Sequence, residues 1–356
     1  MLLVRISHAR QADVAQALVP AVSRLVSTLV RARAAVPKAG VGMSADAAGT
    51  SACATSLPLL LVMALTAAAQ DQPVISVDVD LVNVFCSVRD ARGEYVRDLS
   101  KDDFEILDDG QRREITHFAR EADSPLTVAL LLDVSGSVIH ILETEKRAAA
   151  RFFREVLRPG DRAMLAGFAQ SVAVWQDVTP SKSMLEMALN RAGPLVMRSA
   201  ETLEVRWRGG TLLYDAVNLV AVEKLKRLPG RKAIVIITDG EDYGSLVTLA
   251  NAGKAAQEAD AVVYGIHYEE RPGRYRGGGL SALEKLAEPT GGRTFHVDQA
   301  LPLESVFDAI GGEMRNQYSL AFTPGGPEKA GEFHQLEVKV SRPGLKVQAR
   351  SGYFGK

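Results

Sequence analysis

Three short segments of the 356-residue chain together supply carboxylate and hydroxyl side chains. The first is DVSGS at 133–137, the second is GGT at 209–211, and the third is TDGED at 238–242. Carboxylate and hydroxyl oxygens are hard ligands, and a set with few carboxylates suits a six-coordinate Mg²⁺ ion that keeps some of its waters. A glycine inside the first segment lets it turn tightly, so that both serine hydroxyls can face one point. The candidate metal ligands are Asp133, Ser135, Ser137, Thr211 and Asp239.

The sequence around these segments predicts the elements that position them. Continuous apolar runs at 126–134 (LTVALLLDV) and 232–240 (KAIVIITDG) are typical of strands buried on both faces of a sheet. Stretches with helical periodicity alternate with strands, at 141–157, 181–192, 212–227, 245–259, 280–292 and 303–316. This alternation predicts a doubly wound α/β domain with a mainly parallel sheet and flanking helices. Ligands bind at the carboxyl ends of the strands in such a sheet, so we expect the three segments to meet at one edge.

Two β-rich segments flank the predicted α/β domain. Residues 74–121 alternate apolar and polar side chains with the period of a half-buried strand, and Asp109-Gly110 marks a hairpin turn. Residues 317–354 are also strand-like, with turns at 324–326 and 343–344. Neither segment is large enough to bury a good core alone. We therefore expect the two to pack together as one small β-sandwich.

The three oxygen-rich segments resemble a known motif. In order, spacing and strand context, DVSGSV, GGT and ITDGED are similar to the metal-ion-dependent adhesion site of von Willebrand factor type A domains, and the resemblance covers about 126–312. The flanking VRDLSKDDFEILDDG and RSGYF are similar to a group of exported bacterial proteins with this domain, abundant in acidobacteria. The resemblance implies a von Willebrand A (Rossmann-like) fold. It also implies that three hydroxyls (Ser135, Ser137, Thr211) contact the cation and that Asp133 and Asp239 bind it directly or through water.

The N-terminal region predicts export. Residues 57–69 carry no charge and are too short to span a membrane, but they have the length of a signal-peptide core, and 67–69 offer a small-residue cleavage site. A leader of 69 residues is longer than usual, so two interpretations stay open: a long leader, or a true start at Met43. Both predict a periplasmic, envelope-associated or secreted protein without a membrane span once the leader is removed.

Composition excludes several classes of function. The chain is 47% hydrophobic and 24% charged, as in ordinary globular proteins, and its net charge is −1. Residues 1–69 hold six basic and two acidic residues, so the rest of the chain is acidic, which argues against nucleic acid as a partner. Of the two cysteines, Cys53 precedes the predicted cleavage site and Cys86 lies in an apolar alternation typical of a core residue.

The predicted function is binding rather than catalysis. Each segment alone could be an ordinary strand end, helix cap or turn, but the three together favour a metal site. Ser135 does not lie in a Gly-x-Ser-x-Gly turn, and the six histidines form no His-x-x-x-His pair. We expect an exported, metal-dependent protein-binding module that is not an enzyme. It would bind an acidic side chain of a partner through Mg²⁺, with Mn²⁺ or Ca²⁺ open, in adhesion or assembly.

Two alternatives remain open. One is a metal-dependent hydrolase that uses Asp239 or Glu241 as a base. The other is a structural envelope module with an unused metal site. Asp215 and Asp242 are candidate accessory acids, and Trp207 is a candidate contact residue.

Overall fold

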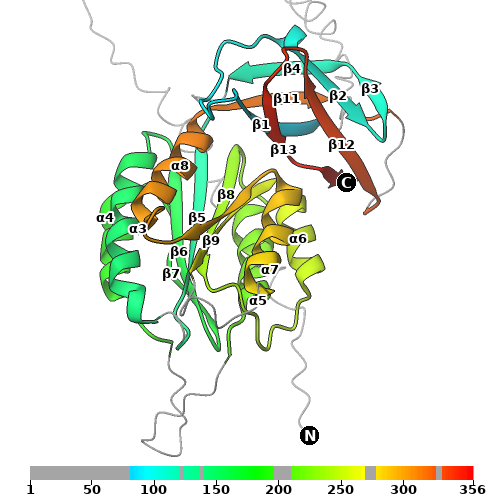
Figure 1. The fold of residues 1–356 in the computed structure, drawn as a ribbon. Helices are drawn as coiled ribbons and strands as arrows, with labels where there is room; N and C mark the ends of the chain where they lie inside the picture. The colour runs from blue at the N-terminus through cyan, green and yellow to red at the C-terminus, as the bar shows by residue number, and fades with distance from the viewer. Residues whose placement is uncertain are drawn as a thin grey trace, which may run out of the picture. The chain divides into compact units, whose positions relative to one another are not determined.

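The computed structural model describes residues 81–120, 124–136, 139–195, 210–268, 278–325 and 331–355 (Figure 1). The chain divides at Ile75 and Ser76, and every described residue belongs to the second unit, Ser76–Lys356. The predicted leader at 1–69 and the alternative start at Met43 lie outside the described residues. Within the described part of the chain, no helix is both long and apolar enough to cross a membrane.

The central element of the second unit is a six-stranded sheet with the order β10-β9-β8-β5-β6-β7. All neighbouring pairs are parallel except β6 with β7. Every residue of the two central strands β5 and β8 is buried, as their apolar runs predict. The mainly parallel α/β fold is therefore confirmed. The strands are β5 (Leu126–Asp133), β6 (Arg162–Phe168), β7 (Val172–Thr179), β8 (Arg231–Thr238), β9 (Ala261–Tyr268) and β10 (Arg293–Val297).

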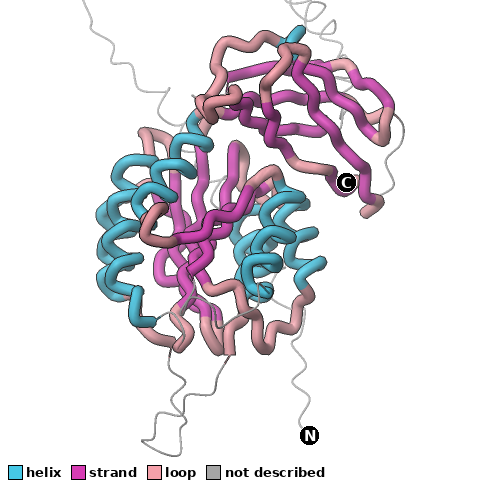
Figure 2. The backbone as a smooth tube through the Cα atoms, viewed as in Figure 1, coloured by secondary structure: helices cyan, strands magenta, loops and turns pink. Residues whose placement is uncertain are grey.

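Helices cover both faces of this sheet (Figures 1 and 2). On one face lie α3 (Leu142–Val156), α4 (Lys182–Arg191) and α8 (Leu303–Arg315). On the other lie α5 (Leu213–Leu219), α6 (Leu249–Glu258) and α7 (Gly278–Ala287). Side chains of β5 alternate between the two cores: Leu130 and Leu132 join the first, and Ala129 and Leu131 join the second.

Three predicted helices differ from the observed ones. The helix predicted at 280–292 is observed as α7, which ends at Ala287 and is followed by a 3-10 turn at Glu288–Thr290. The helix predicted at 245–259 begins only at Leu249, because the Thr248 side chain caps it by accepting a hydrogen bond from the Asn251 amide. The amides of Leu246 and Val247 donate to Asp215 instead of entering a helix. The helix predicted at 212–227 is observed as α5 followed by a π-helical turn at Val220–Leu225.

The remaining strands form two four-stranded sheets, with the orders β13-β1-β11-β4 and β14-β12-β2-β3. Each sheet contains strands from both ends of the described chain, since β1 pairs with β11 and β12 pairs with β2. The two sheets share one apolar core, which makes them a small sandwich and confirms that part of the fold class. The strands are β1 (Val82–Arg89), β2 (Phe104–Asp108), β3 (Gln111–Arg113), β4 (Ile115–Arg120), β11 (Gln317–Phe322), β12 (Phe333–Val340), β13 (Lys346–Ala349) and β14 (Gly352–Phe354).

Local features of the sandwich follow the sequence. The predicted hairpin turn joins β2 to β3, with φ of 49° at Asp109 and 77° at Gly110, the backbone that a tight two-residue hairpin requires. Cys86 is fully buried, and burial raises the pKa of its thiol to about 12, so it is a core residue as expected. The domain boundaries at 74–121, 126–312 and 317–354 stay a prediction.

A buried acidic residue of α8 connects the sandwich to the α/β domain. The Glu313 side chain is 1% exposed. Its carboxylate accepts a 2.6 Å hydrogen bond from Arg89 of β1 and a 3.0 Å hydrogen bond from the Tyr264 hydroxyl of β9. It also forms an ion pair with Arg293 of β10, at 3.1 Å. One carboxylate thus joins strands of both parts of the second unit.

Candidate metal centre

Asp133 lies at the carboxyl end of β5 and is fully buried. Its Oδ1 accepts a 2.9 Å hydrogen bond from the amide of Ser135, and its Oδ2 accepts a 2.6 Å hydrogen bond from the hydroxyl of Thr238 at the end of β8. Burial raises the pKa of Asp133 to about 6, and the negative charge of Asp239 adds to the shift against the effect of these hydrogen bonds. Two strand ends therefore fix the orientation of this carboxylate.

Asp239 follows Thr238 at the same edge and is partly exposed. Its Oδ1 accepts a 3.1 Å hydrogen bond from the amide of Glu241. The turn between them requires glycine, because Gly240 has a φ of 79° and a Cβ there would lie 2.3 Å from the carbonyl oxygen of Gly279. The turn thus packs directly against the first turn of α7, which fixes the backbone that carries Asp239.

The segment that contains Thr211 forms backbone hydrogen bonds with the loop after β8 and with the residue that follows β6. Thr211 exchanges two backbone hydrogen bonds with Tyr243, at 3.1 and 2.9 Å. The next amide, of Leu212, donates to the carbonyl of Ala169, directly after β6. Because β6 is the neighbour of β5 in the sheet, this places Thr211 at the edge that carries Asp133.

The two candidate accessory acids hold loops together. The Asp242 carboxylate accepts hydrogen bonds from the Tyr214 amide, at 3.1 Å, and from the Ser245 hydroxyl, at 2.6 Å. The Asp215 carboxylate accepts from the amides of Leu246 and Val247. These contacts connect the start of α5 to the loop after β8, so both carboxylates stabilise the backbone around the site.

The structure therefore brings four of the five candidate ligands to the carboxyl edge of the central sheet. Asp133 and Asp239 supply carboxylates, and Ser135 and Thr211 are hydroxyl residues that are 7% and 9% exposed. Ser137 lies outside the described residues, as do Trp207 and Gly209. An oxygen-only donor set with two like charges that repel each other fits a hard divalent cation.

One further acidic residue, Glu145, interacts electrostatically with Asp133 and was not predicted from the sequence. Glu145 lies in the first turns of α3 and is fully buried, and neither carboxylate oxygen has a hydrogen-bond partner among the residues that the structure describes. Burial raises its pKa to about 9, with a further contribution from the charge of Asp133. The sequence does carry a signal: Glu145 stands three residues from both Leu142 and Ala148, in the buried stripe of α3.

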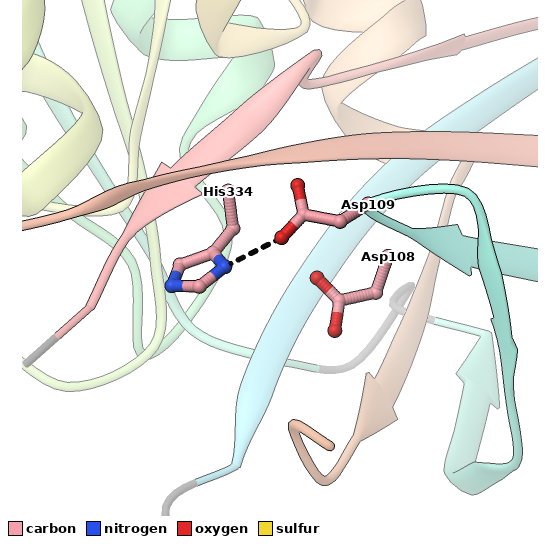
Figure 3. Close-up of side chains that lie close together, drawn as sticks. All are labelled: Asp108, Asp109 and His334. Carbon is pink, nitrogen blue, oxygen red and sulfur yellow. Dashed lines mark hydrogen bonds and ion pairs between the residues drawn. The ribbon is translucent and has the colours of Figure 1, made fainter. Parts of the chain in front are cut away.

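A second cluster of acidic and histidine side chains lies in the sandwich (Figure 3). One ligand atom each of Asp108, Asp109 and His334 lies within 4.8 Å of the others. Asp108, however, already pairs with Arg113 at 3.0 Å and accepts a 3.1 Å hydrogen bond from the Tyr353 hydroxyl. Asp109 forms a 2.8 Å contact with Nδ1 of His334, as Figure 3 shows. These contacts tie the β2–β3 hairpin to β12 and β14, which explains the cluster without a metal.

Comparison with known proteins identifies the family of the central domain. Residues 128–241 match the von Willebrand factor type A domain family, and this part of the chain belongs to it. No protein of curated function is significantly similar in sequence.

Several solved structures resemble the chain. The conserved hypothetical protein BatB of Bacteroides thetaiotaomicron is 22% identical, with a TM-score of 0.41, over 53% of this chain and 97% of that one. A von Willebrand factor type A protein of Catenulispora acidiphila is 14% identical, with a TM-score of 0.45, over 71% of this chain and 73% of that one. Proximal thread matrix protein 1 of the mussel byssus, with a zinc-occupied MIDAS motif, is 14% identical, with a TM-score of 0.45, over 58% of this chain and 49% of that one. At these identities the likeness concerns the fold alone.

Proposed function

We propose that the central domain binds an acidic group of a partner protein through a divalent cation held at the carboxyl edge of its sheet. The observation that carries the proposal is the environment of Asp133. Its carboxylate is buried and oriented by two strand ends, it is repelled by Asp239, and hydroxyl residues stand at the same edge. Asp133, Ser135, Ser137, Thr211 and Asp239 would hold the ion, which supplies a positively charged binding point.

The small number of charges explains why such a site would bind a partner. The candidate ligand set holds few carboxylates, and its hydroxyl ligands carry no charge, so the bound cation stays electrophilic. Asp239 is partly exposed, so the edge is open to solvent. A partner carboxylate can then complete the coordination shell. We propose Mg²⁺ as the physiological ion, with Mn²⁺ and Ca²⁺ as the ions to compare.

We further propose that the protein acts by binding and not as an enzyme, in adhesion or in assembly outside the cytoplasm. The uncharged run at 57–69 supports export, and the donor set supports metal-mediated binding. The acidic balance of the chain beyond residue 69 favours a protein partner over a nucleic acid.

The first test measures the melting temperature of the full chain in EDTA, Mg²⁺, Mn²⁺ and Ca²⁺. A cation at about 100 times its dissociation constant stabilises the fold by about 2.7 kcal/mol, so the melting temperature should rise by roughly 5–10 °C. Asp133→Asn keeps the size of the side chain but removes its charge and should abolish the rise. Glu143→Gln, on the exposed face of α3, is the matched control and should keep it.

Partner binding is tested with a glutamate-containing peptide against its glutamine counterpart. The wild-type chain should retain the glutamate peptide in Mg²⁺, and lose it in EDTA or on Asp133→Asn. If no cation raises the melting temperature at millimolar concentration, or if the two peptides bind equally, the proposal is wrong.

A further inference from the structure

Glu145 is the one buried acidic residue of the described structure whose carboxyl oxygens have no hydrogen-bond partner there. Buried carboxyl groups almost always have hydrogen-bond partners, because desolvation without compensation is costly. Glu145 is fully buried within the apolar stripe of α3, and both of its carboxylate oxygens lack a partner among the described residues. The groups that act on it are the surrounding apolar core and the negative charge of Asp133, and neither favours a buried carboxylate.

Its position connects it to the candidate metal centre. The 3-10 turn Ile139–Ile141 directly precedes α3, and only residues 134–138 stand between this turn and the end of β5. The carboxylate of Glu145 interacts electrostatically with Asp133 at the end of β5 and with Tyr268 at the end of β9. These two strands end at the same edge of the sheet as β8. Glu145 stands near the start of α3, and the buried side chains of this helix pack on one face of the same sheet, so Glu145 lies near the edge that carries the candidate ligands.

We infer that Glu145 is a third acidic group of the metal centre, whose buried negative charge strengthens cation binding at Asp133. This inference rests on the proposed function, because the compensating charge is the cation itself. It differs from the von Willebrand A motif, whose matched positions in this chain are the five candidate ligands alone. In this role Glu145 acts on the bound cation electrostatically, through its negative charge, and is not one of the ligands.

Cation affinity distinguishes this role of Glu145 from a purely structural one. If Glu145 were merely a neutral acid tolerated in the core, an amide of the same size would serve equally well, and cation affinity would not depend on its charge. If it belongs to the metal centre, removal of its charge should weaken cation binding. Changes in groups around metal ligands typically reduce metal affinity by about 10- to 100-fold.

The experiment compares Mg²⁺ and Mn²⁺ dissociation constants, measured by calorimetry on the full chain, for wild type, Glu145→Gln and Glu143→Gln. Glu143 lies two residues away on the exposed face of α3, where it pairs with Lys146 at 2.8 Å, so it controls for charge on the same helix. We expect Glu145→Gln to bind about 10- to 100-fold more weakly and Glu143→Gln to bind within twofold of wild type. In EDTA the Glu145→Gln chain should melt at or above the wild-type temperature.

Two further outcomes are decisive. Glu145→Met, which fills the same space without a polar group, gives the same comparison if the buried amide prevents folding. An affinity within twofold of wild type in a variant that melts cooperatively overturns the inference while leaving the metal site intact. If the wild-type chain binds neither ion, the proposed function and this inference both fail.

Discussion

Glu313 and Glu145 lie on neighbouring helices of one face of the sheet, α8 and α3, and both are almost completely buried. Their surroundings are opposite. Glu313 accepts hydrogen bonds from Arg89 and the Tyr264 hydroxyl, and it pairs with Arg293, so two cations of the chain compensate its charge. Glu145 has no such contact among the described residues.

The pKa shifts follow the same contrast. Burial raises the pKa of Glu313, and the charges of Arg293 and Arg89 act to lower it again. Burial also raises the pKa of Glu145, to about 9, but there the nearby charge of Asp133 adds to the shift. The fold thus compensates the charge of Glu313 with arginines of the chain itself, where the sandwich meets the α/β domain. Glu145, near the candidate metal centre, has no compensating positive charge from the described part of the chain. A site that binds a cation from solution requires such an uncompensated carboxyl group.

The largest expected effect is the pH dependence of the metal-free protein. A carboxyl whose pKa is raised by folding binds a proton in the folded state that the unfolded chain has released, so stability falls as pH rises towards the folded pKa. For Glu145 this window extends from about 4.5 to about 9, and for Asp133 it ends at about 6. Between pH 6 and 9 in EDTA, Glu145 should therefore cost about 1.4 kcal/mol of unfolding free energy per pH unit.

Urea unfolding at several pH values measures this slope. Glu145→Gln should remove that contribution and leave those of the other groups, among which Tyr268, with a pKa raised to about 12, titrates above the window. Equal slopes for wild type and the variant would show that Glu145 has an unshifted pKa and that the contrast with Glu313 is false.

The next largest effect concerns Glu313. Glu313→Ala would leave Arg89 and Arg293 without their shared carboxylate, and removing one partner of a buried ion pair costs about 3–5 kcal/mol. Because both arginines keep some exposure, we expect the lower end, about 3 kcal/mol, in urea unfolding. Asp308→Asn, which breaks an exposed ion pair of the same helix with Arg151, is the matched control and should have no measurable effect. A loss as small as the control's would mean that burial of Glu313 does not depend on these cations.

The sequence alone could not distinguish the two glutamates. Each stands in the buried stripe of a helix whose period is clear, Glu145 near Leu142 and Glu313 near Ile310. The difference lies in residues far away along the chain: Arg89 is 224 positions from Glu313, and only the pairing of β1 with β11 brings it close. Periodicity predicts the face on which a side chain lies, but the partner it meets there depends on tertiary structure.

Some features of the candidate metal centre were likewise predictable from the sequence, and others were not. The ends of β5 and β8 were predictable, because the apolar run of each of these eight-residue strands stops at Asp133 or at Thr238. The backbone pairing of Thr211 with Tyr243 and the capture of the Val247 amide by Asp215 were not, because both join segments about 30 residues apart without a periodic pattern. The capture also explains why the helix predicted at 245 begins late.

The smallest expected effect tests whether the contact between the sandwich and the α/β domain influences the candidate metal centre. Arg350 of the sandwich pairs with Asp260 of the α/β domain at 2.8 Å, and the two side chains are 10% and 29% exposed. Asp260 has a φ of 52°, a conformation that asparagine also tolerates, so Asp260→Asn removes the charge without new backbone strain. We expect a loss of about 1 kcal/mol in urea unfolding and an unchanged Mg²⁺ dissociation constant. A weaker affinity for Mg²⁺ would show that contacts between the sandwich and the α/β domain influence the candidate metal centre. The surroundings of Glu313 and Glu145 would then not be independent of each other.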